Sequence, residues 1–443
     1  LDNYEQPHKI IILKTDNTMS NKNSNYLAIG IMFFLFAMIS FVTGLQNPMG
    51  VIVKTQFGAT NAMSQLGNLA NFIAYAFMGL PAGFILKKYG YKITALAAVA
   101  VGFIGVFVSF ISGVVELFPV YLIGAFISGF SMCMLNTVVN PMLNTLGGGG
   151  NKGNQLIQLG GSLNSLAATI VPVFVGYLMG DVASARISDA NPALFIAMAI
   201  FALAFVIIFF SAIPEPELEA AKAAPAKESE GVVASVKGAL SHNNLLFGII
   251  AIFVYVGVEV GIPNIANLYM TSGAEHGGLG IATGTAGTIV GLYWLLMLCG
   301  RLVGGALGGK ISSKHMMTGV SSVAILLVIL GILIPESAVI SLGALADGAV
   351  VPVKILCFVL CGLCTSVMWG SIFNLAVEGL GKYTSIASGV FMVMVCGGGI
   401  LPYFQGLLAD VTSFVSSYWL IVVALGYMLC YTLFLSKPTP EEE

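Results

Sequence analysis

The stretch that decides the fold is MLNTVVNPMLNTLG, residues 134–147, because it returns much later in the chain as MWGSIFNLAVEGLG, residues 368–381. The two stretches align without a gap, and the Met, Asn, Leu and Gly that they share fall in register. The next apolar run in each half repeats too, as PVFVGYL at 172–178 and PYFQGLL at 402–408. Such an internal repeat indicates a chain built from two similar halves.

The composition indicates a membrane protein with many crossings. Of the 443 residues, 57% are hydrophobic and 9% are charged, against roughly 45–50% and about 25% in a soluble domain. A bilayer-spanning helix needs about 20 mostly apolar residues, and the apolar runs are continuous, unlike the alternating strands of a membrane barrel. Twelve runs meet this length: 26–53, 64–86, 93–111, 118–140, 155–180, 193–213, 245–270, 282–307, 316–334, 353–377, 385–408 and 415–435.

The spacing of the repeat fixes how the halves are related. The fourth run pairs with the tenth and the fifth with the eleventh, so the offset is six helices, and paired helices cross in the same direction. Two parallel six-helix halves are the architecture of major-facilitator transporters. The segment between the halves is rich in charge, alanine and proline, as linkers are. The expected fold is therefore all-α, divided into a cytoplasmic segment 1–25, a first half 26–213, a cytoplasmic linker 214–243, a second half 244–436 and a cytoplasmic tail 437–443.

The distribution of lysine and arginine predicts the orientation, because cytoplasmic loops carry the excess. With both termini cytoplasmic, the outer side keeps only Lys54, Arg186 and Lys354. The first 25 residues lack the apolar core of a secretory signal. Because the chain opens on leucine, Met19 is a candidate start of the native protein. The inner side then receives Lys9, Lys14, Lys22, Lys87, Lys88, Lys92, Lys152, Lys222, Lys227, Lys237, Arg301, Lys310, Lys314, Lys382 and Lys437.

Several classes of site are not expected. The seven cysteines all lie inside apolar runs, and the four histidines are scattered, so neither a disulfide framework nor a metal site is predicted. A net charge of −2 gives no electrostatic footprint for nucleic acid. No cofactor is predicted, and the expected non-protein partners are membrane lipid and a small solute.

Amide side chains in the middle of apolar helices either bond neighbouring helices to each other or bind a solute, and they are the candidate solute ligands. Asn136, Asn140 and Asn144 recur every fourth residue and form one stripe on a helix. An amide offers donors and an acceptor together, which suits a neutral solute rich in hydroxyl groups. Flat aromatic rings complete the predicted site, which comprises Gln46, Asn47, Asn136, Asn140, Gln158, Asn164, Asn264, Trp369 and Tyr403, with Trp294 as a further ring.

Glu259 is an acid well inside an apolar helix, in the stretch VGVEVG. A charged carboxylate at the bilayer centre costs on the order of 2.5–3.5 kcal/mol on insertion scales, so it must be protonated, paired or hydrated. Alignment through Gly44 and Gly257 makes Gln46 its counterpart in the first half. Glu259 is the predicted proton-coupling residue, while Glu378 and Asp410 lie nearer helix ends, where structural roles are expected.

A narrower resemblance rests on five segments. NTVVNP (136–141), YVGVEVG (255–261), Gly300-Arg301, IFNLAVEGLGK (372–382) and GGGILP (397–402) resemble the fucose:proton symporter family of the major facilitator superfamily, and within it the bacterial glucose/galactose permeases. The resemblance implies proton-coupled sugar transport. Two acids that the fucose permeases use with the proton are replaced here by Asn47 and Asn136, which cannot titrate.

The expected function is import of a neutral sugar, a hexose such as glucose, galactose or fucose, by a proton-coupled secondary transporter of the bacterial inner membrane, acting as a monomer. An uncoupled or sodium-coupled carrier of another small polar solute remains open. A channel is disfavoured because no stretch resembles a selectivity filter. A membrane-embedded transferase is the alternative among enzymes, although no catalytic constellation is apparent.

Overall fold

A computed structural model describes residues 7–147, 150–179, 186–215, 232–307, 311–346, 348–380 and 383–437. Most of the expected linker, residues 216–231, lies outside these ranges, as do the two ends of the chain. Helices make up nearly all of what is described. The first half contains α1 (Pro7–Gly44), α2 (Gln46–Phe57), α3 (Asn61–Ser64), α4 (Leu66–Val115), α5 (Phe118–Leu146), α6 (Gly150–Met179), the 3-10 turn η1 (Ile187–Ala190) and α7 (Asn191–Phe210).

The second half begins with α9 (Val232–Leu240), α10 (Asn243–Thr271), η2 (Ala274–His276), α11 (Thr283–Leu307) and α12 (Ser313–Leu333). An antiparallel pair of short strands, β1 (Val339–Ser341) and β2 (Val350–Pro352), encloses η3 (Gly343–Ala346). The chain continues through α13 (Val353–Thr365), α14 (Met368–Val377), α15 (Thr384–Met394), α16 (Gly397–Val411), α17 (Tyr418–Cys430) and the π-helical turn η5 (Tyr431–Leu435).

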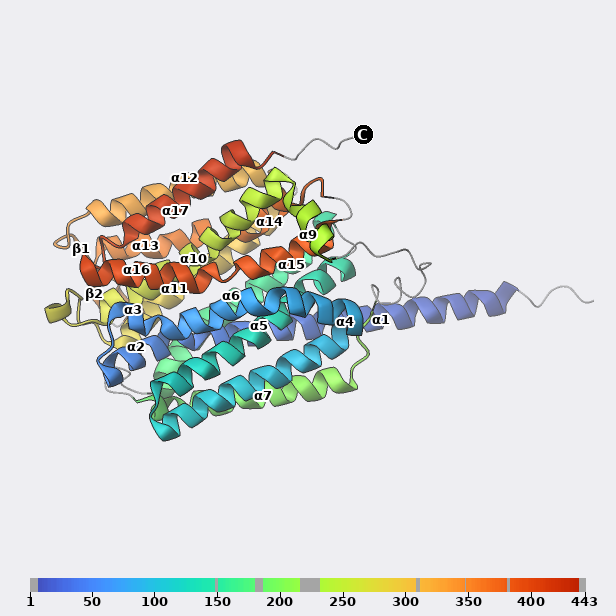
Figure 1. The fold of residues 1–443 in the computed structure, drawn as a ribbon, viewed down its shortest axis with the longest axis horizontal. Helices are drawn as coiled ribbons and strands as arrows, with labels where there is room; N and C mark the ends of the chain where they lie inside the picture. The colour runs from blue at the N-terminus through green and yellow to red at the C-terminus, as the bar shows by residue number, and fades with distance from the viewer. Residues whose placement is uncertain are drawn as a thin grey trace, which may run out of the picture.

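The two halves lie side by side as separate bundles, blue to green and yellow to red in Figure 1. Their main contacts pair α6 with α11, and α4 with α15 and α16. One end of the molecule carries α3 and the β1–β2 pair, and we call it the hairpin end (Figure 1). The opposite end carries α9 and the carboxyl end of α17, and we call it the linker end.

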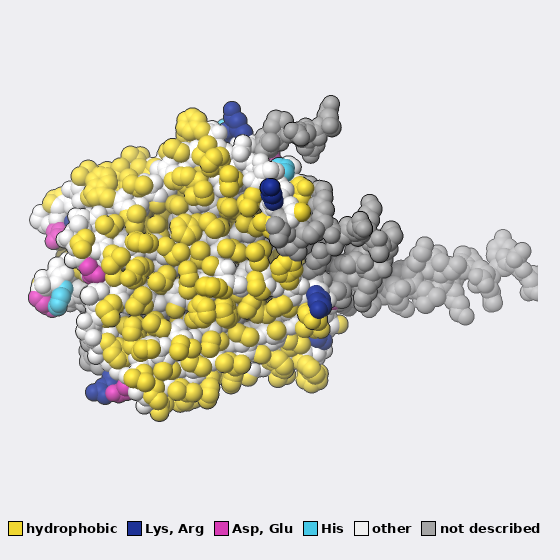
Figure 2. Space-filling view, in the orientation of Figure 1, with side chains coloured by type: hydrophobic (Ala, Val, Ile, Leu, Met, Phe, Trp, Pro, Cys, Tyr) yellow, Lys and Arg dark blue, Asp and Glu magenta, His cyan; other side chains and the backbone are white. Residues whose placement is uncertain are grey.

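The surface has the apolar belt of a membrane protein. Figure 2 shows hydrophobic side chains over the middle of the face and charged side chains at its two ends. Within the described ranges, eleven segments are long and apolar enough to cross a membrane, and α6 adds a shorter apolar segment, Leu156–Val171. Together they correspond to the twelve expected crossings. Two of them belong to α4, which is interrupted at Gly90, where φ is 81°.

Three of the expected crossings are broken, which the hydropathy pattern did not predict. The first breaks at Leu45, just before Pro48, which lacks the N–H that a continuous helix needs. The tenth breaks between α13 and α14, where the Ser366 hydroxyl donates to the Leu363 carbonyl at 2.6 Å. The eleventh breaks before a run of three glycines that starts at Gly397. A Cβ at Gly397 would collide with the carbonyl oxygen of Phe253, so glycine permits close helix packing there.

Candidate functional site

A cavity of about 170 Å³ lies between the two halves. Both halves supply its walls: α1, α4, α5 and α6 from the first, α10, α11 and α14 from the second. Ser366 and Val395 line it at two of the helix breaks. Irregular backbone at membrane depth is tolerated where it borders such a cavity. The polar and aromatic lining residues are Phe36, Ser40, Thr43, Asn68, Phe72, Tyr75, Asn136, Asn140, Gln158, Asn164, Glu259, Asn264, Trp294, Arg301, Ser366 and Trp369.

Most of the predicted site residues thus meet at one place. Asn136, Asn140, Gln158, Asn164, Asn264, Trp369 and Glu259 all line the cavity. Tyr403 is not among its lining residues, and its ring contacts Phe404 instead, at 6.0 Å between centroids. Gln46 and Asn47 are the first residues of α2, but the structure does not describe their side chains.

The asparagine stripe on α5 is partly bonded to itself. Asn136 donates from Nδ2 to the Tyr75 hydroxyl and to the Met132 carbonyl, both at 3.0 Å. Asn140 donates to the Asn136 carbonyl at 2.9 Å and approaches its Oδ1 at 3.4 Å. These bonds hold both amides in place without a solute, so the wall is preorganised and keeps acceptor oxygens for further donors.

The opposite strip of the first half, on α6, contains an acceptor with no partner. Asn164 Oδ1 is buried and makes no hydrogen bond within the part of the chain that the structure describes. The Ser40 hydroxyl donates to the backbone carbonyl of the same residue at 2.5 Å. An unpaired buried acceptor costs about 1–3 kcal/mol. A solute hydroxyl that donates to Asn164 would remove this cost.

Glu259 is paired in the cavity with Arg301 of the neighbouring helix α11. Arg301 Nη2 lies 3.3 Å from Glu259 Oε1, and the side chains are only 10% and 12% exposed. Nη1 of the same guanidinium donates across the halves to the Gly161 carbonyl at 2.6 Å and to Ser165 Oγ at 2.9 Å. Tyr293 donates to the Glu259 carbonyl at 3.2 Å. A buried acid must be protonated, paired or hydrated, and Glu259 is paired.

Counting Arg301 among the inner cations was therefore wrong. It lies within α11, six residues before the last, and its side chain is buried against α10 and α6. The sequence did contain a signal: a buried Glu259 needs a cation, and Arg301 lies inside the next apolar run. Of the predicted aromatic rings, Trp369 and Trp294 line the cavity, and Trp369 packs edge-on against Tyr255 and Phe391, with ring centroids 6.2 and 5.7 Å apart.

Hydrogen bonds between the halves continue from the cavity toward the hairpin end. Asn264 donates to Gln65 Oε1 at 3.0 Å, and Asn68 donates to the Gly398 carbonyl at 2.8 Å. Farther out, the two carboxylate oxygens of Asp410 accept from the backbone N–H groups of Asn61 and Ala62, each at 3.0 Å. Asp410 has the structural role expected of it, and that role joins α16 to α3.

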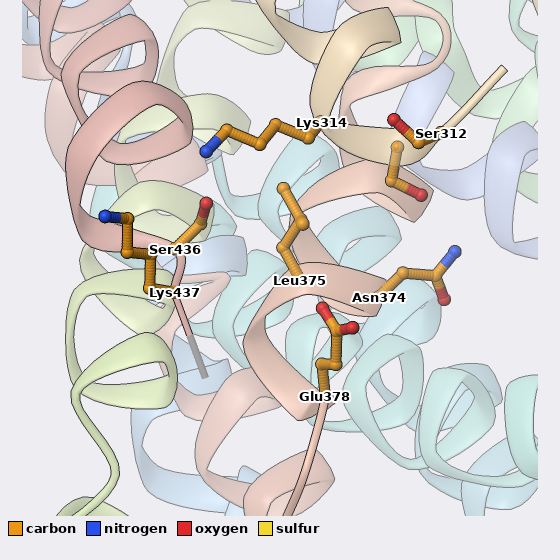
Figure 3. A pocket seen from close by; sticks show the side chains of 8 residues that line it. Ser312, Lys314, Asn374, Leu375, Glu378, Ser436 and Lys437 are labelled. Atoms are coloured by element: carbon orange, nitrogen blue, oxygen red, sulfur yellow. The ribbon is translucent and has the colours of Figure 1, made fainter. Parts of the chain in front are cut away.

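A second hollow, of about 410 Å³, lies at the linker end (Figure 3). It is lined by Ser312, Ser313, Lys314, Asn374, Leu375, Glu378, Ser436 and Lys437. Figure 3 shows Lys314, Ser436 and Lys437 along one side and Asn374 on the other. These residues lie in the second half or, for Lys437, directly after it, so this hollow is not between the two bundles. The predicted site residues that the structure brings together line the central cavity instead.

Known proteins resemble this chain over nearly its whole length. A glucose/galactose transporter of Brucella abortus is 28% identical over 433 residues, covering 95% of this chain and 96% of that protein. An L-fucose-proton symporter of Escherichia coli is 22% identical over 400 residues, covering 86% and 85%.

Solved structures share the fold. The crystal structure of the major-facilitator transporter FucP in the outward conformation superposes with a TM-score of 0.69 at 19% identity, covering 94% of this chain and all of that one. A crystal structure of the nucleoside transporter NupG gives a TM-score of 0.64 at 14% identity, covering 92% and 98%. A family model described as Major Facilitator Superfamily matches residues 32–401. With two six-helix bundles around a polar central cavity, the chain belongs to the major facilitator superfamily.

Proposed function

We propose that this protein is a secondary transporter that carries one neutral hexose at a time through the central cavity by alternating access. The observation that carries the proposal is the cavity itself, because amides such as Asn136 and Asn140 of the first half and the rings of Trp294 and Trp369 of the second line the same space. The glucose/galactose and L-fucose transporters among its relatives support a sugar as the solute. A site built within one chain supports transport by a monomer.

The size and chemistry of the cavity favour a single sugar ring. Its volume of about 170 Å³ is below the roughly 300–1,000 Å³ of pockets that hold drug-sized ligands. Asn136 and Asn140 supply amide groups, and Asn164 supplies an unpaired acceptor. Trp294 and Trp369 offer apolar faces for the C–H side of a pyranose. A charged solute would have to compete with the Glu259–Arg301 pair.

We infer that Glu259 takes the coupling proton. An ionised Glu259 attracts the Arg301 guanidinium, which also donates to Gly161 and Ser165 in the other half. A proton on Glu259 removes that attraction, and the guanidinium then keeps only its hydrogen bonds to Gly161 and Ser165 of α6. Protonation therefore changes a contact between the halves as well as the charge in the cavity, and coupling a proton to alternating access needs such a link.

The proposed location is the bacterial inner membrane, with the linker end in the cytoplasm. The described lysines of the predicted inner loops, such as Lys237 and Lys437, adjoin helix ends on that side. The acids Glu116, Glu275 and Glu336 follow or precede helix ends on the hairpin side. An excess of lysine and arginine on one face marks the cytoplasmic side.

The test uses purified protein in proteoliposomes. A panel of sugars, including deoxy and amino sugars, is offered in counterflow: saturable exchange of a hexose identifies a carrier, flux that does not saturate identifies a channel, and chemical change of the sugar identifies an enzyme. Glu259→Gln keeps an oxygen for Arg301 but cannot be ionised. It should retain counterflow and lose accumulation driven by a pH gradient.

The matched control for coupling is Glu275→Gln. Glu275 is the next acid along the chain, in the loop after the same helix, and its side chain is 71% exposed. Accumulation should survive in this variant. Proton-driven accumulation by Glu259→Gln would refute the coupling role of this residue. Accumulation driven by a sodium gradient would identify sodium, and not the proton, as the coupling ion.

A further inference from the structure

The hairpin end is closed by a short segment of the first half that three contacts attach to the second half. The segment runs from α3 into the start of α4, residues 61–68. Asp410 binds its first two N–H groups, Asn264 donates to Gln65, and Asn68 donates to the carbonyl of Gly398. Backbones also pack closely there, since a Cβ at Gly406 would lie only 3.0 Å from the Ala62 Cα.

The Asp410 contact is the outermost and the only charged one of these three. The first N–H groups of a helix have no partner within the helix, and a carboxylate that accepts from them forms charge-assisted hydrogen bonds. Both oxygens are engaged at 3.0 Å, so the carboxylate fixes the direction of approach as well as the distance. In the internal repeat, the residue that corresponds to Asp410 is Gly180.

The same segment reaches the solute site. Asn264 lines the cavity while its amide donates to Gln65, which directly follows α3. Opening the hairpin end requires α3 to leave α16, so the Asp410 bonds and the Asn264–Gln65 bond must break in the same movement. A solute that competes for the Asn264 amide weakens the closure from inside.

We propose that Asp410 is a positioning residue that holds the hairpin end of the transporter closed by binding the start of α3. It touches no solute. Its effect is on the balance between the state closed at the hairpin end and the state open there. Loss of a charge-assisted hydrogen bond is worth at least about 1.4 kcal/mol, so Asp410→Asn should change this ratio about tenfold.

The experiment measures the opening directly, without a substrate. Spin labels are placed at Met63 on α3 and Val339 on β1, which are 42% and 54% exposed, in a background in which the exposed Cys299 and Cys430 are serines. Double electron–electron resonance then gives the distance distribution across the hairpin end. Asp410→Asn should increase the population with the longer distance, and Asp410→Glu, which keeps a carboxylate, should restore much of the original distribution.

A control and a second variant make the test specific. Glu116→Gln removes an acid at the same end that pairs with Arg186 inside the first half, and it should leave the distances unchanged. Ala62→Pro deletes one of the two N–H donors and leaves the carboxylate in place, so it should shift the distribution as Asp410→Asn does. Unchanged distances in both Asp410→Asn and Ala62→Pro, or an equal shift in Glu116→Gln, would overturn the proposal.

The proposal is independent of the sugar and of the proton, because the labels report the conformation of the empty carrier. Transport supplies a second readout. In reconstituted protein, Asp410→Asn should raise the apparent affinity for solute offered at the hairpin end, because a larger fraction is competent to bind there. A rise at the linker end instead would contradict the assigned direction of closure.

Discussion

The pair formed by Glu259 and Arg301 makes a prediction about stability that transport assays cannot make. Arg301→Met keeps an apolar stem of similar length and removes the guanidinium. Glu259 then has no cation beside it, and its side chain is only 12% exposed. Removing one partner of a buried pair costs about 3–5 kcal/mol. The unfolding temperature of this variant should therefore be well below that of the wild type.

The double variant separates pairing from packing. Glu259→Gln alone should be milder than Arg301→Met, since the guanidinium keeps Gly161 and Ser165 as acceptors. Glu259→Gln with Arg301→Met leaves no buried charge at the site. It should recover part of the loss, with a coupling energy of about 1–3 kcal/mol between the two positions.

The assay is thermal unfolding of the four proteins in one detergent at pH 7, followed by repeated scans at lower pH. Acidification should reduce the difference in unfolding temperature between Arg301→Met and the wild type, because a protonated Glu259 needs no cation beside it. Arg186→Met is the matched control: Arg186 pairs with Glu116 at 3.1 Å, but the side chains are 66% and 53% exposed, and such surface pairs contribute about 0–1 kcal/mol. If the double variant loses as much stability as the two single variants together, the two charges do not stabilise each other.

Two further predictions concern the cavity wall and the packing of the first half. Asn136→Leu should weaken sugar binding by about 1–3 kcal/mol in a binding titration, because the hydroxyls of the solute and of Tyr75 lose a partner. Asn374→Leu, outside the cavity, should leave the affinity unchanged. If Asn136→Leu binds sugar as tightly as the wild type, Asn136 serves helix packing. Gly129→Ala should lower the unfolding temperature, since a Cβ there collides with the Asn71 carbonyl oxygen, whereas Gly426→Ala meets nothing within 4 Å and should be neutral.

Hydropathy and the internal repeat were enough to predict the architecture. Both depend on local sequence, and a membrane allows few alternatives to apolar helices. The same logic found much of the cavity wall, because an amide such as Asn140 inside an apolar run must face a partner or a solute. Such reasoning identifies which residues face inward without saying which of them meet.

What escaped prediction depends on contacts between distant segments. Arg301 was counted with the cations of the inner side although it lies within an apolar run, because its partner Glu259 lies on another helix. The bonds of Asp410 to α3 link residues 349 and 348 positions apart, and no local pattern encodes such a pairing. The break before Gly397 was invisible as well, because a window averaged over a whole span does not register an interrupted backbone. The roles of all the predicted site residues stay predictions.

The ion pair also has an electrical consequence. While Glu259 is ionised, its charge and that of Arg301 cancel, so the centre of the empty carrier is neutral and the membrane potential does little work on it as it reorients. If Glu259 takes up a proton, the site carries one positive charge, and a full crossing is then worth about 2.3 kcal/mol per 100 mV. A negative cytoplasm would draw the loaded carrier inward and leave the return of the unloaded carrier indifferent to voltage.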